Sequence, residues 1–283
     1  MNFIQNEIQN FIKYSVPDIS KWSTENLGGE HFQVIKASTN DSESASLIGL
    51  AFDYYARIET AKHSGINLKQ FCNFKAEEAI AKLWNNKYKQ LCRAVMNRYC
   101  WSLAVIDEYI RGNESQKHKL AEICLFLAKM EHYARGDGLC EDMLDSSRKD
   151  ITSDIENLVC AYDEYVLDSI KERSNIVFNP KFKCYSMADG DLAIGNTLID
   201  FKTSRKTDNI DGHLEQIWKY MLLSKIDNMN GIETLDISKI TLYYARFART
   251  ISYEACDSEV IEHAKNLRDI LNKYSKCLNM CRK

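Results

Sequence analysis

The stretch GDLAIGNTLIDFKTS, from Gly190 to Ser204, decides how this sequence is expected to fold. Its centre, Gly195-Asn196, is a two-residue turn signal between two short apolar runs, which is the pattern of a β-hairpin. A two-residue loop also fixes the register of the two strands. The expected pairs are Ile194 with Thr197, Ala193 with Leu198, Leu192 with Ile199, and Asp191 with Asp200. The sequence therefore predicts a tight hairpin in which two carboxylates lie opposite each other.

Three charged side chains of this hairpin are expected to share one face of the sheet, because side chains alternate along a strand. These are Asp191, Asp200 and Lys202, while Leu192, Ile199 and Phe201 are expected on the opposite face. Directly opposed residues hold their Cβ atoms about 4.5–5.5 Å apart, where like charges repel. A divalent metal ion would remove this repulsion, since Mg²⁺ is typically held by one or two carboxylates. Lys202 would then lie beside the metal, as a charge for a phosphate or for an attacking water.

The same charges also have a simpler explanation. They could form the solvent-exposed side of an edge hairpin, with Lys202 neutralising Asp189 or Asp200. The spacing of the residues leaves both interpretations open.

The rest of the chain divides into a helical part and a mixed part. Pro17 and Pro180 are the only prolines among 283 residues, so the interval between them lacks the strongest helix breaker. Apolar residues at helical spacing predict helices over residues 44–63, 116–135 and 140–170, and one long helix or two consecutive helices over residues 74–111. After residue 174 the expected order is a strand at 175–180, the hairpin, a helix at 212–225, a strand at 237–251 and a helix at 257–277. This order predicts a small α/β core preceded by a large helical segment.

Composition bounds the class of protein. The chain is 45% hydrophobic and 27% charged with a net charge of −3, and no segment reaches the roughly 18 uncharged apolar residues of a membrane span. Glu7 interrupts the N-terminal stretch where a secretory signal needs an apolar run. We therefore expect a cytoplasmic protein with no membrane partner, and the sequence identifies no protein partner.

The ten cysteines are expected to be reduced thiols, because most are scattered through apolar, helical surroundings. Cys277 and Cys281 are the only close pair, and an iron–sulfur cluster would need more cysteines at short intervals. The charge near the hairpin is more informative. Residues 171–206 hold seven Lys or Arg against four acids, so the surroundings of the hairpin are locally basic.

Several motifs now match a known family. Asp191, eight residues and then Asp200-Phe201-Lys202 resemble the signature of the PD-(D/E)XK nuclease superfamily. Gln216-Ile-Trp-Lys-Tyr220, in the helix that follows, resembles the Q-x-x-x-Y element of the RecB-like branch, and its two polar residues share one helix face. Gly49-Leu-Ala-Phe-Asp53 resembles the first core helix of that branch. This sequence departs from the family in lacking a proline before Asp191 and the histidine common upstream.

The resemblance implies a restriction-endonuclease-like α/β (α+β) core, a small mixed sheet flanked by helices, with a large helical N-terminal and inserted segment. The core would comprise residues 44–63 and 171–283. Residues 1–43 would be an N-terminal helical region, and residues 64–170 a helical insertion that is a candidate substrate clamp.

The resemblance also implies a function and a site. The protein would be a nuclease that depends on Mg²⁺ or Mn²⁺, with DNA favoured over RNA. The metal ligands would be Asp191, Asp200, the backbone carbonyl of Phe201 and, as a further ligand, Asp53. Lys202 would assist the attacking water, and Gln216 and Tyr220 would position the substrate or the lysine. The residues expected to contact substrate phosphates are Thr203, Ser204 and Arg205.

Two other functions compete with this one: a nuclease fold that binds nucleic acid or protein without cutting, and a metal-dependent enzyme that acts on a small nucleotide. Residues 84–93 interleave aromatic and basic side chains, as single-strand-binding surfaces do. The amphipathicity of a helix explains that stretch more simply.

Overall fold

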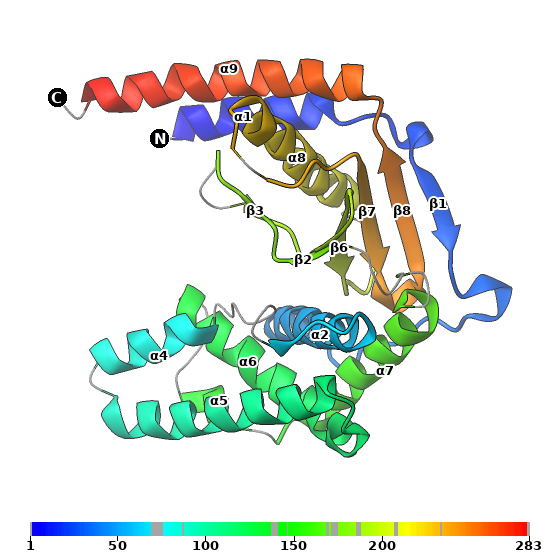
Figure 1. The fold of residues 1–283 in the computed structure, drawn as a ribbon, viewed down its shortest axis with the longest axis vertical. Coiled ribbons are helices and arrows are strands. Elements are labelled where there is room, and N and C mark those ends of the chain that lie inside the picture. The colour runs from blue at the N-terminus through cyan, green and yellow to red at the C-terminus, as the bar shows by residue number, and fades with distance from the viewer. Residues whose placement is uncertain are drawn as a thin grey trace.

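The computed structural model describes residues 2–68, 76–86, 88–136, 141–145, 147–167, 170, 175–184, 188–206, 209–232 and 234–281. Its centre is a six-stranded mixed sheet with the order β1-β8-β7-β6-β5-β2 (Figure 1). The strands are β1 (Ser23–Asn26), β2 (Ile176–Phe178), β5 (Leu192–Ile194), β6 (Thr197–Lys202), β7 (Lys239–Tyr244) and β8 (Arg249–Glu254). β6 and β7 run parallel, and the other neighbours are antiparallel. A separate two-stranded ladder consists of β3 (Lys181–Phe182) and β4 (Ala188–Asp189).

Helices cover both faces of the sheet, as Figure 1 shows. One face carries the α8 layer, which consists of α1 (Asn2–Ser15), α8 (Ile210–Met229) and α9 (Asp257–Cys281). The other carries the α2 layer, which consists of α2 (Ser42–His63), α4 (Ala76–Asn85), α5 (Lys89–Ile110), α6 (Leu120–Arg135) and α7 (Lys149–Tyr165). The protein is therefore a mixed α/β fold with its sheet between two helical layers.

The predicted hairpin register is confirmed. Ile194 pairs with Thr197, Ala193 with Leu198, and Leu192 with Ile199. Gly195 has a φ of +59°, a left-handed conformation that a glycine adopts without strain. However, the hairpin is not at the edge of the sheet, because β7 pairs with β6 on its other side and β2 pairs with β5. The explanation of the charges as an exposed edge is therefore wrong.

Alternate residues of β6 enter two different cores. Ile199 and Phe201 pack into the α2 layer, together with Leu192, as predicted for this face. Leu198 packs instead against the α8 layer. Because side chains alternate along a strand, Asp200 lies on the same face as Leu198, which is the face that the α8 layer covers.

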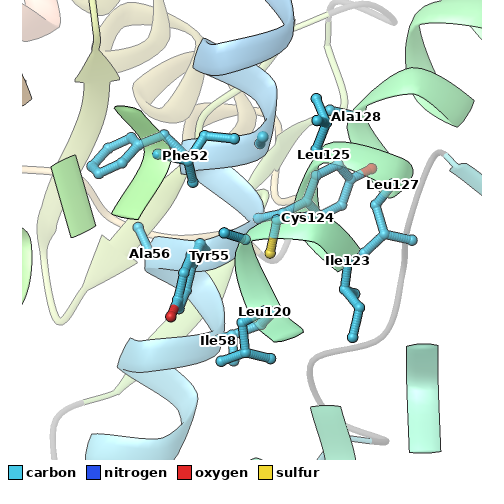
Figure 2. Packing of buried hydrophobic residues seen from close by; sticks show 14 of the residues in the cluster. Phe52, Tyr55, Ala56, Ile58, Leu120, Ile123, Cys124, Leu125, Leu127 and Ala128 are labelled. Carbon is cyan, nitrogen blue, oxygen red and sulfur yellow. The ribbon is translucent and has the colours of Figure 1, made fainter. Parts of the chain in front are cut away.

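The helical segment 64–170 shares one hydrophobic core with α2. Figure 2 shows side chains of α2, among them Phe52, Tyr55 and Ile58, against Leu120 and Cys124 of α6. The segment thus forms most of the α2 layer, and its helix α7 contacts the sheet, where Tyr162 packs against Phe201 and Tyr243. The expected boundary of the core at residue 171 falls outside the described residues.

Some predicted elements differ from those observed. Of the two alternatives for residues 74–111, one long helix or two consecutive helices, the described residues show the second, α4 and α5. The helices expected to begin at 116 and 140 begin as α-helix at Leu120 and Lys149. The single strand expected over 237–251 is two strands, β7 and β8, joined by a 3₁₀ turn at Ala245–Phe247. Residues 23–26, expected within a helical region, form β1 and pair with β8.

A buried ion pair joins the α2 layer to the β7–β8 turn. Arg246 donates two hydrogen bonds to the carboxylate of Asp154 on α7, at 2.7 and 2.8 Å. Its Nε donates to the carbonyl of Thr203, at 2.8 Å, and the hydroxyl of Ser38 donates to Asp154. Both charged side chains are almost completely buried, so every polar partner in this network contributes to holding the α2 layer on the sheet.

Among the residues that the structure describes, every helix is too short or too polar to span a bilayer.

A second buried carboxylate lies further along α2, at Glu59. Tyr109 of α5 donates its hydroxyl to both carboxylate oxygens, at 2.8 and 2.9 Å. Lys117 lies 3.7 Å from Glu59 and 3.2 Å from Asp163 of α7, so one lysine serves two acids, while Lys62 lies over the ring of Tyr109. Burial, followed by the charge of Asp163, raises the pKa of Glu59 to about 7.

The raised pKa of Glu59 predicts a stability that falls with pH. The folded protein holds the proton more tightly than the unfolded chain, whose Glu titrates near 4.5, so stability is lost as pH rises from 4.5 through about 7. The loss is about 3 kcal/mol. In urea unfolding at pH 5 and pH 8, Glu59→Gln is expected to remove the part of the slope that Glu59 contributes and to leave the part that the raised pKa values of Asp53, Asp191 and Asp200 contribute. Glu254→Gln, an exposed control, should keep the full slope. Parallel profiles for the wild type and Glu59→Gln would contradict the prediction.

Candidate active site

A cavity of about 330 Å³ lies at the end of β6, between α2, α6 and α8. Seven of the predicted site residues line it, although they are spread over more than 160 positions of the sequence. They are Asp53, Asp191, Asp200, Phe201, Lys202, Gln216 and Tyr220. The fold thus brings the separate sequence motifs into one space.

The two hairpin acids lie at the heart of the cavity. Asp200 is on β6 and only 2% exposed. Asp191 lies one residue before β5, and its Oδ2 accepts a hydrogen bond from the backbone N–H of Phe201, at 2.7 Å. Burial raises the pKa of both carboxyls, and for Asp191 the neighbouring charges of Asp200 and Asp53 raise it further. The raised pKa of Asp191 agrees in direction with the close approach of two carboxyls that the hairpin register predicts.

A polar chain leads from this strand to α8. The Nζ atom of Lys202 lies 2.5 Å from Asp200 Oδ2 and donates to Gln216 Oε1, at 3.0 Å. Gln216 in turn donates its Nε2–H to the hydroxyl of Tyr220, at 2.9 Å. The crossover from β6 through α8 to the parallel strand β7 places α8 over this face, and the four-residue spacing puts Gln216 and Tyr220 side by side. The ring of Phe182 stacks on Tyr220, which fixes its position.

Asp53 enters the cavity from the opposite layer. It forms an ion pair with Arg57, one turn further along α2. Its Oδ1 atom is buried without a hydrogen-bond partner. Burial is the main cause that raises the pKa of Asp53 to about 6. The side chain therefore has one oxygen held by Arg57 and one available to a ligand in the cavity.

The sequence did not indicate two further cavity residues, Glu131 and Arg135, which come from α6. They form an ion pair, and Tyr54 of α2 donates its hydroxyl to Glu131, at 2.6 Å. The two ion pairs that the α2 layer contributes to the cavity, Asp53 with Arg57 and Glu131 with Arg135, are each an acid followed four residues later by arginine. This four-residue spacing is the feature of the sequence that could have indicated Glu131 and Arg135, but ion pairs on solvent-exposed helices have the same spacing.

The residues after Lys202 turn away from the cavity. The carbonyl of Thr203 is bound by Arg246, and the hydroxyl of Ser204 is buried without a hydrogen-bond partner. Arg205 donates from Nη2 to the carbonyl of Asn40, at 2.8 Å. A role of Thr203, Ser204 and Arg205 in contacting phosphates stays a prediction, and none of the three lines the described cavity.

The donor atoms around the cavity suit a hard cation in part. Carboxylates outnumber basic side chains by five to three among the described lining residues: Asp53, Glu131, Asp189, Asp191 and Asp200 against Arg57, Arg135 and Lys202. Oxygen atoms are the ligands that Mg²⁺ and Mn²⁺ prefer. No three or more His, Cys, Asp or Glu side chains within the described residues are already arranged around a metal position. The carboxylates of Asp191 and Asp200 therefore suit a metal ion, whereas one oxygen of Asp53 is already paired with Arg57.

Comparison of the chain with protein-family models, with curated proteins and with solved structures found no match. The cavity and its side chains are therefore the basis for assigning a function. The side chains of Cys277 and Cys281, the close cysteine pair, lie outside the described residues.

Proposed function

We propose that the protein is a metal-dependent nuclease that hydrolyses phosphodiester bonds, with DNA as the favoured substrate. The observation that supports this most is the convergence of Asp191, Asp200 and Lys202 with Gln216 and Tyr220 in one buried, acidic cavity. The β5–β6 hairpin, the α8 crossover and the parallel strand β7 support a restriction-endonuclease-like core. Mg²⁺ or Mn²⁺ is the proposed cofactor.

The carboxylates of Asp191 and Asp200, together with the carbonyl of Phe201, would hold the metal ion. When bound, it would polarise the phosphodiester and lower the pKa of the attacking water. The hydrogen bond from Phe201 N–H fixes one oxygen of Asp191 and leaves the other for binding. Asp53 has a free Oδ1 atom and is the proposed further ligand.

Lys202 would act on the reacting phosphate or water. An ammonium group carries three N–H donors, of which Gln216 accepts one, and the carboxylate of Asp200 lies 2.5 Å from the Nζ atom. A remaining donor can be directed at a phosphate oxygen or at the attacking water. Tyr220 accepts a hydrogen bond from Gln216, and Gln216 accepts one from Lys202. The direction of the remaining N–H groups of Lys202 is therefore fixed by two side chains of α8.

The basic side chains of the α2 layer would face the substrate. Arg57 and Arg135 line the wall opposite the hairpin acids, where they can bind phosphate oxygens next to the one that is cleaved. Each is now paired with an acid of its own helix, which keeps it extended toward the cavity.

Incubation with linear, circular and single-stranded DNA, and with RNA, in Mg²⁺ or Mn²⁺ tests the proposal. Metal-dependent cleavage is expected, lost on adding EDTA and in both Asp200→Ala and Lys202→Ala. Lys265→Ala, which removes an exposed lysine of α9, is the matched control and should cleave normally. Cleavage that survives Asp200→Ala or Lys202→Ala contradicts the assigned site. Binding of DNA without any cleavage indicates the non-cutting alternative, and hydrolysis of mononucleotides alone indicates an enzyme of small nucleotides.

A further inference from the structure

The outer surface of α4 and α5 exposes large side chains that are usually buried. Trp84 is 57% exposed, Tyr88 48%, Met96 42% and Trp101 38%. The buried side of α5 is made by other residues: Cys92, Val95, Tyr99 and Val105. Amphipathic packing of a helix, the simpler explanation of this stretch, therefore accounts for those residues but not for the exposed aromatic ones.

The same surface belongs to the longest stretch of positive charge in the α2 layer. Residues 79–106 contain no Asp or Glu and five Lys or Arg, although the whole chain has a net charge of −3. Lys89, Arg93 and Met96 follow one another at helical spacing, and all three are exposed, so they form one stripe along α5. Trp101 follows Met96 by five residues and therefore lies to one side of this stripe, although it is exposed as well. From Lys89 to Trp101 the exposed surface of α5 extends about 18 Å along the helix axis, at 1.5 Å per residue.

Basic groups accompany both exposed tryptophans. The guanidinium of Arg98 lies 4.3 Å from the ring centre of Trp101, and Lys119 lies 5.8 Å from it. Lys89 lies 6.0 Å from the ring centre of Trp84. Arg98 also forms an ion pair with Glu122, at 3.8 Å, so its charge is shared between this acid and the ring of Trp101. Aromatic rings with adjacent cations are what unpaired bases and their phosphates need, because a base stacks on the ring while the cation binds the backbone.

This surface connects to the cavity through α6. Lys82 of α4 donates to the carbonyl of Tyr133, at 2.7 Å, and Asn86 donates to its hydroxyl, at 3.2 Å. Tyr133 precedes the cavity residue Arg135 by two positions. Figure 1 shows α4 beside α6, on the side away from α2. The C-terminal end of α4, which carries Trp84, is thus held directly against the helix that forms the cavity wall.

We propose that the α4–α5 face, defined by Trp84, Tyr88, Lys89, Arg93, Met96 and Trp101, binds single-stranded nucleic acid and leads it over the end of α6 to the cavity. This inference rests on the proposed nuclease function and narrows it: the substrate carries a single-stranded stretch of several nucleotides beside the bond that is cut. A duplex presents its bases stacked inside and offers no free ring to Trp84 or Trp101.

Tryptophan fluorescence tests the binding step apart from cleavage. The chain has four tryptophans, of which Trp22 and Trp218 are buried and Trp84 and Trp101 exposed. Titration with oligothymidylate of about fifteen nucleotides, in EDTA so that no cleavage occurs, is expected to quench the exposed pair. The double variant Trp84→Ala with Trp101→Ala should lose most of the quenching and bind about tenfold or more weakly. A duplex of the same length should compete poorly.

Three further variants sharpen the test. Trp84→Phe keeps a ring for stacking and should bind nearly as well as the wild type. Tyr14→Ala removes an aromatic side chain that is 83% exposed on α1, outside the α2 layer, and should change nothing. Lys89→Ala with Arg93→Ala should lower the slope of log affinity against log salt by about 0.7 for each phosphate that the variant no longer binds.

The outcomes separate this inference from the proposed function. Quenching without any cleavage of DNA or RNA in Mg²⁺ or Mn²⁺ supports the binding face and overturns the nuclease. Cleavage of single-stranded DNA with an unchanged KM in the double tryptophan variant overturns the binding face and leaves the nuclease intact. Self-association in sedimentation that the double variant abolishes, with no quenching by oligothymidylate, assigns the aromatic surface to a protein contact and also overturns the inference.

Discussion

Asp191→Asn is expected to lower metal-dependent cleavage by about 10³-fold or more, because it weakens binding of a metal ion that supplies several kcal/mol of stabilisation to a phosphoryl transition state. The same change is expected to raise the melting temperature of the metal-free protein. Asn keeps an oxygen that can accept the Phe201 N–H, while the repulsion from Asp200 and Asp53 disappears. Loss of activity with a gain of stability is the signature of a side chain kept for chemistry.

Thermal unfolding with and without Mg²⁺ separates the two effects. Mg²⁺ should raise the melting temperature of the wild type, since a ligand that binds only the folded state stabilises it. The Asp191→Asn protein should respond much less. Asp189→Asn is the control, because Asp189 lines the same cavity but lies outside the proposed ligand set. A variant at Asp191 that cleaves at the wild-type rate would refute its role, and one that melts lower without metal would refute the repulsion.

Arg246→Ala is expected to destabilise the protein by about 3–5 kcal/mol, because it leaves the carboxylate of Asp154 buried and without its cation. Asp154 is 2% exposed, so bulk water is a poor substitute partner. The bonds from Arg246 to the carbonyl of Thr203 and to Asp154 would be broken together. Urea unfolding should show a lower midpoint with an unchanged slope, since the surface exposed on unfolding stays the same.

Two further variants test whether burial of the ion pair causes this destabilisation. Arg246→Met combined with Asp154→Leu removes both charges and is expected to recover much of the stability. Arg111→Ala breaks an ion pair with Asp107 that has the same residue types but an arginine 76% exposed, and should cost less than about 1 kcal/mol. Equal destabilisation by Arg246→Ala and Arg111→Ala would show that burial of the Arg246–Asp154 pair is not what stabilises the packing of the α2 layer on the sheet.

Sequence reasoning succeeded where the determining interactions are local. The Gly195-Asn196 turn specifies the register of its two strands without help from the rest of the chain, and the observed pairing agrees with it. The four-residue spacing of Gln216 and Tyr220 likewise places them on one face of α8. Asp53 was indicated as a cavity residue by its place in a helical motif, and it lines the cavity.

The elements that were missed depend on distant partners. The turn between β7 and β8 contains no Gly, Pro, Asn or Asp, and Ala248 adopts a φ of +41° while its carbonyl binds Leu27 N–H. β1 is four polar, exposed residues whose strand conformation comes only from pairing with β8. Glu131 and Arg135 reach the cavity because α6 packs on α2, and no pattern within α6 records where this helix packs.

The spread of the cavity along the chain has a consequence for how the protein is made. Its walls come from α2, from the end of α6 and from the stretch between Asn179 and Tyr220. The interactions that close it are therefore between residues as much as a hundred or more positions apart, which form slowly compared with local ones. A growing chain has no complete cavity until Tyr220 has left the ribosome, and β6 lacks its parallel neighbour until β7 follows. Under the proposed function, unfinished chains would carry the α4–α5 face but would be unable to cleave nucleic acid, without any inhibitor.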